Sequence, residues 1–194
     1  MLQLSQIKSA PNQLTLLRLI FVPFIVTAVI EGHYLRAMIL FVLAGVSDGL
    51  DGLLARAFNQ KTMLGLYLDP IADKLLLSTL FLVLSFKHRI PWRVTTMVFS
   101  RDFIILVVCS LVYATTELRD FRPSIWGKLN TVAQIATVFF AMLDEITTLF
   151  WVTQIKVTLF WMTFLLTLIS SLHYVLLLER RLQEVGGSHK EPSL

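Results

Sequence analysis

The chain has 194 residues, of which 56% are hydrophobic and 15% are charged, and its mean hydropathy is +0.72. A soluble domain of this length does not need so much apolar surface, so the composition argues against one and indicates a membrane protein. The net charge of +4 suits an anionic lipid surface and gives no reason to expect a nucleic-acid partner. With Cys109 as the single cysteine, a disulfide framework and a cysteine metal cluster are excluded.

Six apolar segments are long enough to cross a bilayer, which takes about 20 helical residues. In chain order they cover residues 13–31, 35–57, 62–86, 92–115, 125–146 and 150–177. Short polar connections separate them, so consecutive helices should run antiparallel. We therefore predict an all-α membrane protein, a bundle of six transmembrane helices. It forms one membrane-embedded domain over residues 1–194, with a flexible tail at about 182–194.

The distribution of lysine and arginine predicts the orientation in the membrane. With the N-terminus inside, the cytoplasmic segments hold Lys8, Arg18, Arg56, Lys61, Arg119, Arg122, Lys128, Arg180 and Arg181. The opposite side holds fewer cations, namely Arg36, Lys87, Arg89 and Arg93. Because cytoplasmic segments are enriched in these residues, both termini are expected in the cytoplasm.

The second and third segments carry four aspartates, Asp48, Asp51, Asp69 and Asp73. Ionised groups inside a membrane are costly, so such residues indicate a functional site. Spacings of three and four residues place each pair on one helix face. Asp51 and Asp69 lie about 9 Å and about 10 Å from the ends of their predicted helices, at 1.5 Å of rise per residue. The two pairs are therefore expected at the same depth, in the cytoplasmic half of the bilayer.

Carboxylate oxygens without histidine or cysteine suit a hard divalent cation such as Mg²⁺ or Mn²⁺. Four carboxylates are more than one hydrated Mg²⁺ needs, and two cations balance the charge better. Small residues, Gly52, Ala55 and Gly65, fall on the same helix faces. They favour either close packing between helices or room for a bulky ligand beside the metals.

Written out, this stretch is Asp48-x2-Asp51-Gly52-x2-Ala55-Arg56-x8-Gly65-x3-Asp69-x3-Asp73. It resembles the signature of the CDP-alcohol phosphotransferase family, with every spacing intact. The resemblance implies that a phosphatidyl group moves from CDP-diacylglycerol to an alcohol, with release of CMP. It also implies that the four aspartates hold two divalent cations and that Asp73 acts as general base on the acceptor hydroxyl. The residues implied to bind the nucleotide are Gly52, Ala55, Arg56 and Gly65.

The opening stretch "PNQLTLLRLIFVPF" resembles the first helix of the phosphatidylglycerophosphate synthase and cardiolipin synthase branches of that family. The resemblance places Asn12 and Thr15 near the nucleotide. For Asn12, a helix cap is the alternative interpretation.

Cations inside later helices bear on the acceptor alcohol. Arg101 in the fourth segment, with Lys128 and Thr131 in the fifth, would bind the phosphate of a phosphorylated acceptor such as glycerol 3-phosphate. An ion pair between Arg101 and Asp102 is the structural alternative, and for Lys128 it is extension of the side chain to the interface. The Arg101-Asp102 dipeptide is more similar to the cardiolipin synthase branch, which uses phosphatidylglycerol as acceptor.

Three functions are therefore compared. The first is phosphatidylglycerophosphate synthesis from CDP-diacylglycerol and glycerol 3-phosphate, and the second is the same chemistry with phosphatidylglycerol. The third, a cation or proton transporter, is disfavoured because the chain lacks paired broken helices. For a bacterial chain we expect an enzyme among the lipids of the inner membrane, with its active site facing the cytoplasm. A homodimer is compatible with the sequence.

Overall fold

The computed structural model describes the backbone of residues 10–57, 63–115 and 125–187, and the side chains of 19–47, 74–105 and 125–173. Within these residues the fold is all-helical. The helices are α1 (Ala10–Ile30), α2 (Tyr34–Ala57), α3 (Met63–Phe86), α4 (Trp92–Thr115), α5 (Ile125–Ile146) and α6 (Phe150–Gly187). Within the described residues, the predicted all-α class and the order of six helices are confirmed.

The helix boundaries agree with the prediction except at the start of the first helix and the end of the last helix. Helix α1 begins at Ala10 rather than residue 13, with Pro11 in its first turn, where the missing N–H costs nothing. The prediction that the last helix ends at residue 177 is wrong, because α6 continues to Gly187. The segment "LLLERRLQEV" consists almost entirely of strong helix formers, and the helix stops only at the two glycines that follow. Of the predicted flexible tail, residues 188–194 lie outside the described residues.

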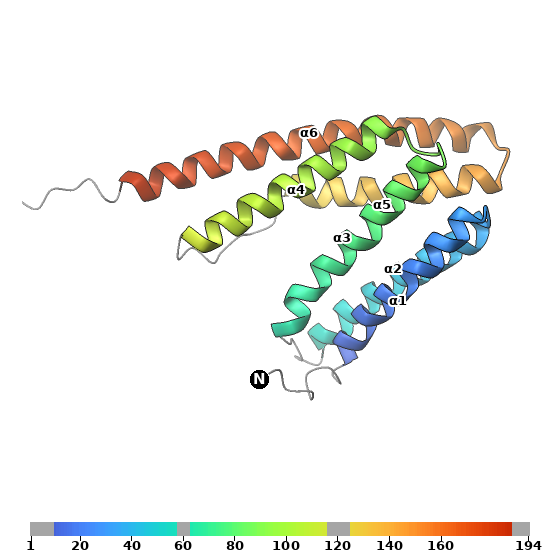
Figure 1. Ribbon diagram of the computed structural model, residues 1–194, viewed down its shortest axis with the longest axis horizontal. Coiled ribbons are helices and arrows are strands. Elements are labelled where there is room, and N and C mark those ends of the chain that lie inside the picture. The colour runs from blue at the N-terminus through green and yellow to red at the C-terminus, as the bar shows by residue number, and fades with distance from the viewer. Residues whose placement is uncertain (1–9, 58–62, 116–124, 188–194) are drawn as a thin grey trace, which may run out of the picture.

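The helices form two groups, α1–α2–α3 and α4–α5–α6 (Figure 1). Helix α1 packs against both α2 and α3, α6 packs against α4 and α5, and α5 also contacts α2 and α3. The start of α1, the end of α2 and the start of α3 lie at the same end of the bundle (Figure 1). The predicted aspartate site therefore belongs to that end.

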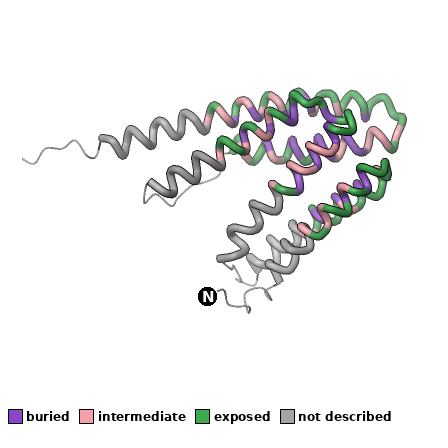
Figure 2. Tube along the Cα trace, in the orientation of Figure 1, coloured by how far each residue is buried: buried purple, intermediate pink, exposed green. Residues whose placement is uncertain are grey.

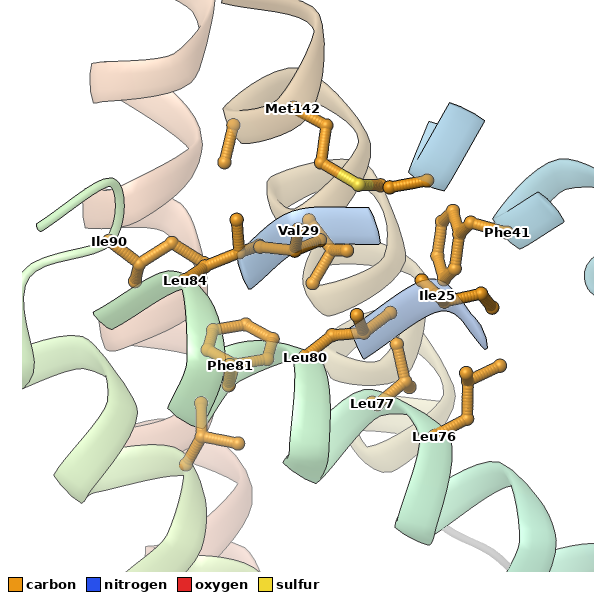
Figure 3. Packing of buried hydrophobic residues seen from close by; sticks show 14 of the residues in the cluster. Ile25, Val29, Phe41, Leu76, Leu77, Leu80, Phe81, Leu84, Ile90 and Met142 are labelled. Carbon is orange, nitrogen blue, oxygen red and sulfur yellow. The ribbon is translucent and has the colours of Figure 1, made fainter. Parts of the chain in front are cut away.

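One apolar core joins the two groups (Figure 3). Ile25 and Val29 of α1 and Phe41 of α2 meet a stripe on α3. That stripe contains Leu76, Leu77, Leu80, Phe81 and Leu84, the spacing expected for one face of a helix. Met142 of α5 closes the core from the other group.

Large apolar side chains also cover the outside of the bundle, while several polar ones are buried inside it. Phe103, Phe150 and Trp161 are exposed, whereas Arg101 and Gln134 are buried. The alternation of exposed and buried positions along α5 and α6 is visible in Figure 2. Such an arrangement suits a hydrocarbon solvent, in which outward apolar residues are stable and inward polar residues join helices.

Two described helices are long and apolar enough to cross a membrane, Ile125–Ile146 and Phe150–His173. Among the residues whose side chains the structure describes, the apolar parts of α1, α2 and α3 are shorter, namely Leu19–Ile30, Tyr34–Ser47 and Lys74–Phe86. The helix lengths themselves, 21 residues for α1 and 24 for each of α2, α3 and α4, match the thickness of a bilayer core, about 30 Å. Six membrane crossings remain a prediction.

An ionic cluster ties the helix connections together at the end of the bundle opposite the aspartates. Arg89, between α3 and α4, pairs with Glu145 at 2.8 Å and lies over the ring of Tyr34, with 5.8 Å from guanidinium to ring centroid. A hydrogen bond to Tyr34, with the nearby carboxylates of Glu145 and Asp144, raises the pKa of Arg89. The pair joins the connection between α3 and α4 to the last turn of α5.

The ends of α1 and α3 have the same local structure but different residues at the left-handed position. After α1, Gly32 has φ +81°, with Gly32 N–H bonded to Val29 O and His33 N–H to Ala28 O. After α3, His88 has φ 58°, with the equivalent bonds to Ser85 O and Leu84 O. Both are Schellman caps, in which glycine is the residue without steric cost.

Exchanging the residues at these caps should change stability in opposite directions. Gly32→Ala should lower the free energy of unfolding by about 1 kcal/mol, because a Cβ is strained at positive φ. His88→Gly should raise it by a smaller amount, since relief of strain is partly offset by a freer unfolded chain. Thermal unfolding in detergent micelles measures both, and a stabilising Gly32→Ala would contradict the assignment.

Candidate active site

The aspartate motif lies on the adjoining ends of α2 and α3. Asp51 is six residues before the end of α2 at Ala57, and Asp69 is six residues after the start of α3 at Met63. Each is therefore about 9 Å along its helix from the connection between them. Asp48 and Asp73 lie one turn farther on the same helices. The side chains of all four lie outside the described ones, so the structure supports their matched depth through the backbone alone.

The oxygen-only donor set fits divalent cations. Four carboxylates at matched distances from one connection supply hard ligands and a charge that two Mg²⁺ or Mn²⁺ ions would balance. Among the side chains that the structure describes, no group of three histidines, cysteines or acids offers an alternative metal site.

The residues predicted to bind the nucleotide occupy the same end of the bundle. Asn12 and Thr15 lie in the first two turns of α1, and Gly65 lies in the first turn of α3. Gly52, Ala55 and Arg56 lie in the last two turns of α2. The side chains at these positions lie outside the described part of the chain, and their contacts with a nucleotide stay a prediction.

Arg101 is held in a network that crosses three helices. Its side chain is 6% exposed, and its Nη1 donates to Asp102 Oδ1 at 2.7 Å. Its Nη2 donates to Ser170 Oγ of α6 at 3.0 Å. The same Asp102 oxygen also pairs with Lys74 of α3. The ion pair between Arg101 and Asp102, which the sequence offered as the structural alternative to phosphate binding, is therefore present, and Lys74, which directly follows Asp73, is directed to α4.

The other two residues predicted to bind the acceptor phosphate lie in the first turns of α5. Lys128 is exposed, in contrast to the buried Arg101. The Thr131 hydroxyl donates to Gly127 O of its own helix at 3.1 Å. Shared binding of one phosphate by Arg101, Lys128 and Thr131 stays a prediction.

A polar seam continues from Arg101 along the interface of α5 and α6. Thr167 Oγ1 donates to Asn130 Oδ1 at 2.9 Å, and Thr137 and Thr163 share a hydrogen bond at 2.8 Å. Thr163, Thr167 and Ser170 follow the helical spacing i, i+4, i+7 on α6, as Asn130, Gln134 and Thr137 do on α5. Sequence reasoning missed Thr167 and Ser170, although their spacing in an apolar helix was a usable signal.

Two buried amide groups in this seam have unused donors. Within the described part of the chain, Asn130 Nδ2 and Gln134 Nε2 make no hydrogen bond although both residues are fully buried. An unsatisfied donor costs about 1–3 kcal/mol, so its retention points to a role other than stability.

Comparisons with known proteins bear on the same motif. The sequence model of the CDP-alcohol phosphatidyltransferase family matches residues 8–169. A probable phosphatidylglycerophosphate synthase of Mycobacterium tuberculosis (strain H37Rv) is 32% identical over 196 residues, covering 97% of this chain and 89% of that protein. A CDP-diacylglycerol–glycerol-3-phosphate 3-phosphatidyltransferase of Shigella flexneri is 33% identical over 172 residues, covering 85% and 92%. Human cardiolipin synthase (CMP-forming) is 34% identical over 147 residues, covering 66% of this chain and 48% of that protein.

The buried amide nitrogen of Gln134, which makes no hydrogen bond among the described residues, leads to a prediction about the free energy of unfolding. Gln134→Met keeps the length of the side chain and removes the buried amide, so it should raise the unfolding free energy of the ligand-free protein by about 1 kcal/mol. Asn130→Leu is the matched control, because it also removes the bond from Thr167 and should not stabilise. Thermal unfolding in micelles distinguishes the two, and a destabilised Gln134→Met would show that the amide already has a structural partner.

Proposed function

Since the chain belongs to the CDP-alcohol phosphatidyltransferase family, we propose that it transfers the phosphatidyl group of CDP-diacylglycerol to glycerol 3-phosphate. The products are phosphatidylglycerophosphate and CMP, which makes the chain an enzyme of phospholipid biosynthesis. The relatives from M. tuberculosis and S. flexneri, which match most of the chain, carry names for this synthesis. The observation that carries the proposal is the complete aspartate motif, at matched positions on α2 and α3 inside the family match.

Two divalent cations, Mg²⁺ or Mn²⁺, are held in this proposal by the aspartates of α2 and α3. When bound, they supply positive charge that offsets the diphosphate and the charge developing on the leaving CMP. The protein's own part is to hold four carboxylates on two helices, at matched distances from the connection between them.

The remaining residues divide between the two substrates. Asp73 takes the proton of the acceptor hydroxyl, a task that suits a carboxylate within hydrogen-bond reach. The nucleotide lies against the start of α1 and the glycine-containing ends of α2 and α3. Arg101, Lys128 and Thr131 bind the acceptor phosphate. Burial supports Arg101, because a charge-assisted bond to phosphate is strongest away from water.

Cardiolipin synthesis, with phosphatidylglycerol as acceptor, is the second candidate. The human relative named for that reaction is 34% identical over the matched region, although this chain spans about half of its length. Both reactions use the same donor and the same aspartates, so the acceptor distinguishes them.

The site is proposed to face the cytoplasm from within a membrane, the inner membrane in a bacterium. The exposed apolar surface, the buried polar seam and the two helices of spanning length support a lipid environment. Exposed tryptophans at the starts of α4, α5 and α6, namely Trp92, Trp126 and Trp151, fit the interfacial belts of membrane proteins. The lysine and arginine distribution supports cytoplasmic termini.

The reaction itself is tested by its products. Purified protein supplied with CDP-diacylglycerol, Mg²⁺ and glycerol 3-phosphate should release CMP and form phosphatidylglycerophosphate in equal amounts. Asp48→Asn, Asp51→Asn and Asp69→Asn should each lower the rate by about a hundredfold or more. Asp144→Asn, far from the motif on α5, is the control. Full activity of the wild type in excess chelator would exclude metal dependence.

Acceptor binding and proton transfer should separate kinetically. Arg101→Ala should raise the KM for glycerol 3-phosphate by about tenfold to a hundredfold, because a charge-assisted bond contributes about 1.5–3 kcal/mol. Asp73→Asn should instead lower kcat, with a metal titration to identify lost cation binding. A lowered kcat with unchanged acceptor KM in Arg101→Ala would assign the arginine a structural ion pair. Transfer to phosphatidylglycerol alone would favour cardiolipin synthesis.

A further inference from the structure

Asp102 pairs with two positively charged side chains that flank the proposed site, Lys74 and Arg101. Its Oδ1 pairs with Lys74 Nζ on α3 and accepts from Arg101 Nη1 on its own helix, α4. The Asp102 side chain is 14% exposed and that of Arg101 is 6% exposed, so this pair is largely desolvated, whereas the Lys74 side chain is 44% exposed and its pair with Asp102 is partly solvated. Ser170 extends the connection to α6 by accepting from the second terminal nitrogen of Arg101.

The pair with Lys74 bears on how α3 is rotated about its axis. Lys74 is the residue after Asp73, and one residue corresponds to about 100° of helical rotation. Ser85 and Thr95 make a second polar contact between α3 and α4, with 2.5 Å between their hydroxyl oxygens. Ser85 lies eleven residues after Lys74, close to three full turns, and therefore on the same face of α3. Two contacts on one face fix both the rotation and the register of α3 against α4.

The rotation of α3 in turn decides where Asp69 and Asp73 project, because both belong to the same continuous helix. The guanidinium of Arg101 is oriented by the same carboxylate. One side chain thus acts on the helix that carries half of the aspartates and on the cation assigned to the acceptor.

We propose that Asp102 is a positioning residue that couples the metal-binding face of α3 to the acceptor-binding arginine of α4. The proposal rests on the proposed function, because it takes the aspartates as cation ligands and Arg101 as a ligand of the acceptor phosphate. Asp102 itself contacts neither substrate. Its effect passes through Lys74 in one direction and through Arg101 in the other.

Two measurements on purified full-length protein in micelles test the coupling. Electron paramagnetic resonance titration of substrate-free protein gives the Kd for Mn²⁺ without turnover. Steady-state kinetics with glycerol 3-phosphate gives the acceptor KM. Asp102→Asn should raise both constants by about tenfold, since it weakens two charge-assisted contacts at once. Lys74→Met should raise the Kd for Mn²⁺ and leave the acceptor KM within about twofold.

Conservative and matched variants separate positioning from general stability. Asp102→Glu keeps the charge and should restore both constants to within about threefold of the wild type. Asp144 makes a comparable part-buried ion pair with Lys156, but between α5 and α6 at the opposite end of the bundle. Asp144→Asn should therefore lower the unfolding temperature and leave both constants unchanged.

A response of Asp102→Asn like that of Asp144→Asn, with a lower unfolding temperature and unchanged constants, would overturn the proposal. If Asp102→Asn does not fold, an unchanged Kd for Mn²⁺ in Lys74→Met has the same consequence. A wild type that binds Mn²⁺ but forms no lipid product would count against the proposed function instead, and the Mn²⁺ titration would still decide the coupling through α3.

Discussion

The cost of placing charge in a low-dielectric interior governs this structure, because every buried ionic group needs compensation. Arg101 shows the rule directly. Its guanidinium is enclosed by α4 and α6, and the structure supplies the carboxylate of Asp102 and the hydroxyl of Ser170 as partners. In the proposed site, the four aspartates of α2 and α3 would need compensation by positive charge. Divalent cations are the compensation that their chemistry favours.

The requirement also explains how the two groups of helices are joined. Apolar packing of α3 against α1, α2 and α5 forms the core, but apolar contacts alone would allow helices to rotate in a lipid solvent. Polar contacts between specific side chains fix how the helices are rotated against one another. The pairs Lys74–Asp102 and Ser85–Thr95 orient α3 on α4, and the hydroxyl and amide seam orients α5 on α6. At the opposite end of the bundle, Arg89 of the connection between α3 and α4 pairs with Glu145 in the last turn of α5.

Much of the fold follows from local sequence, because apolar run lengths and polar connections determine where helices begin and end. Helix α6 is longer than predicted, because the segment rich in leucine, glutamate and arginine at its end remains helical although it is too polar to be recognised as a membrane span. Spacing indicated the faces of the aspartates, and the Arg101–Asp102 pair was an explicit alternative. The spacing of Ser170 indicated a polar face on α6, but its pairing with Arg101 and that of Lys74 with Asp102 were not predictable, because they depend on how α3 and α6 rotate against α4. Local sequence does not encode that rotation.

The most direct test of the account is the number of divalent cations bound per chain. Purified wild-type protein, saturated with CDP-diacylglycerol in the absence of an acceptor, should bind two Mn²⁺ per chain, as the four carboxylates require for charge balance. Removal of one carboxylate from α2 and one from α3 should abolish this binding while the helical fold persists. A catalytically active wild type that binds no Mn²⁺ under these conditions would contradict the account.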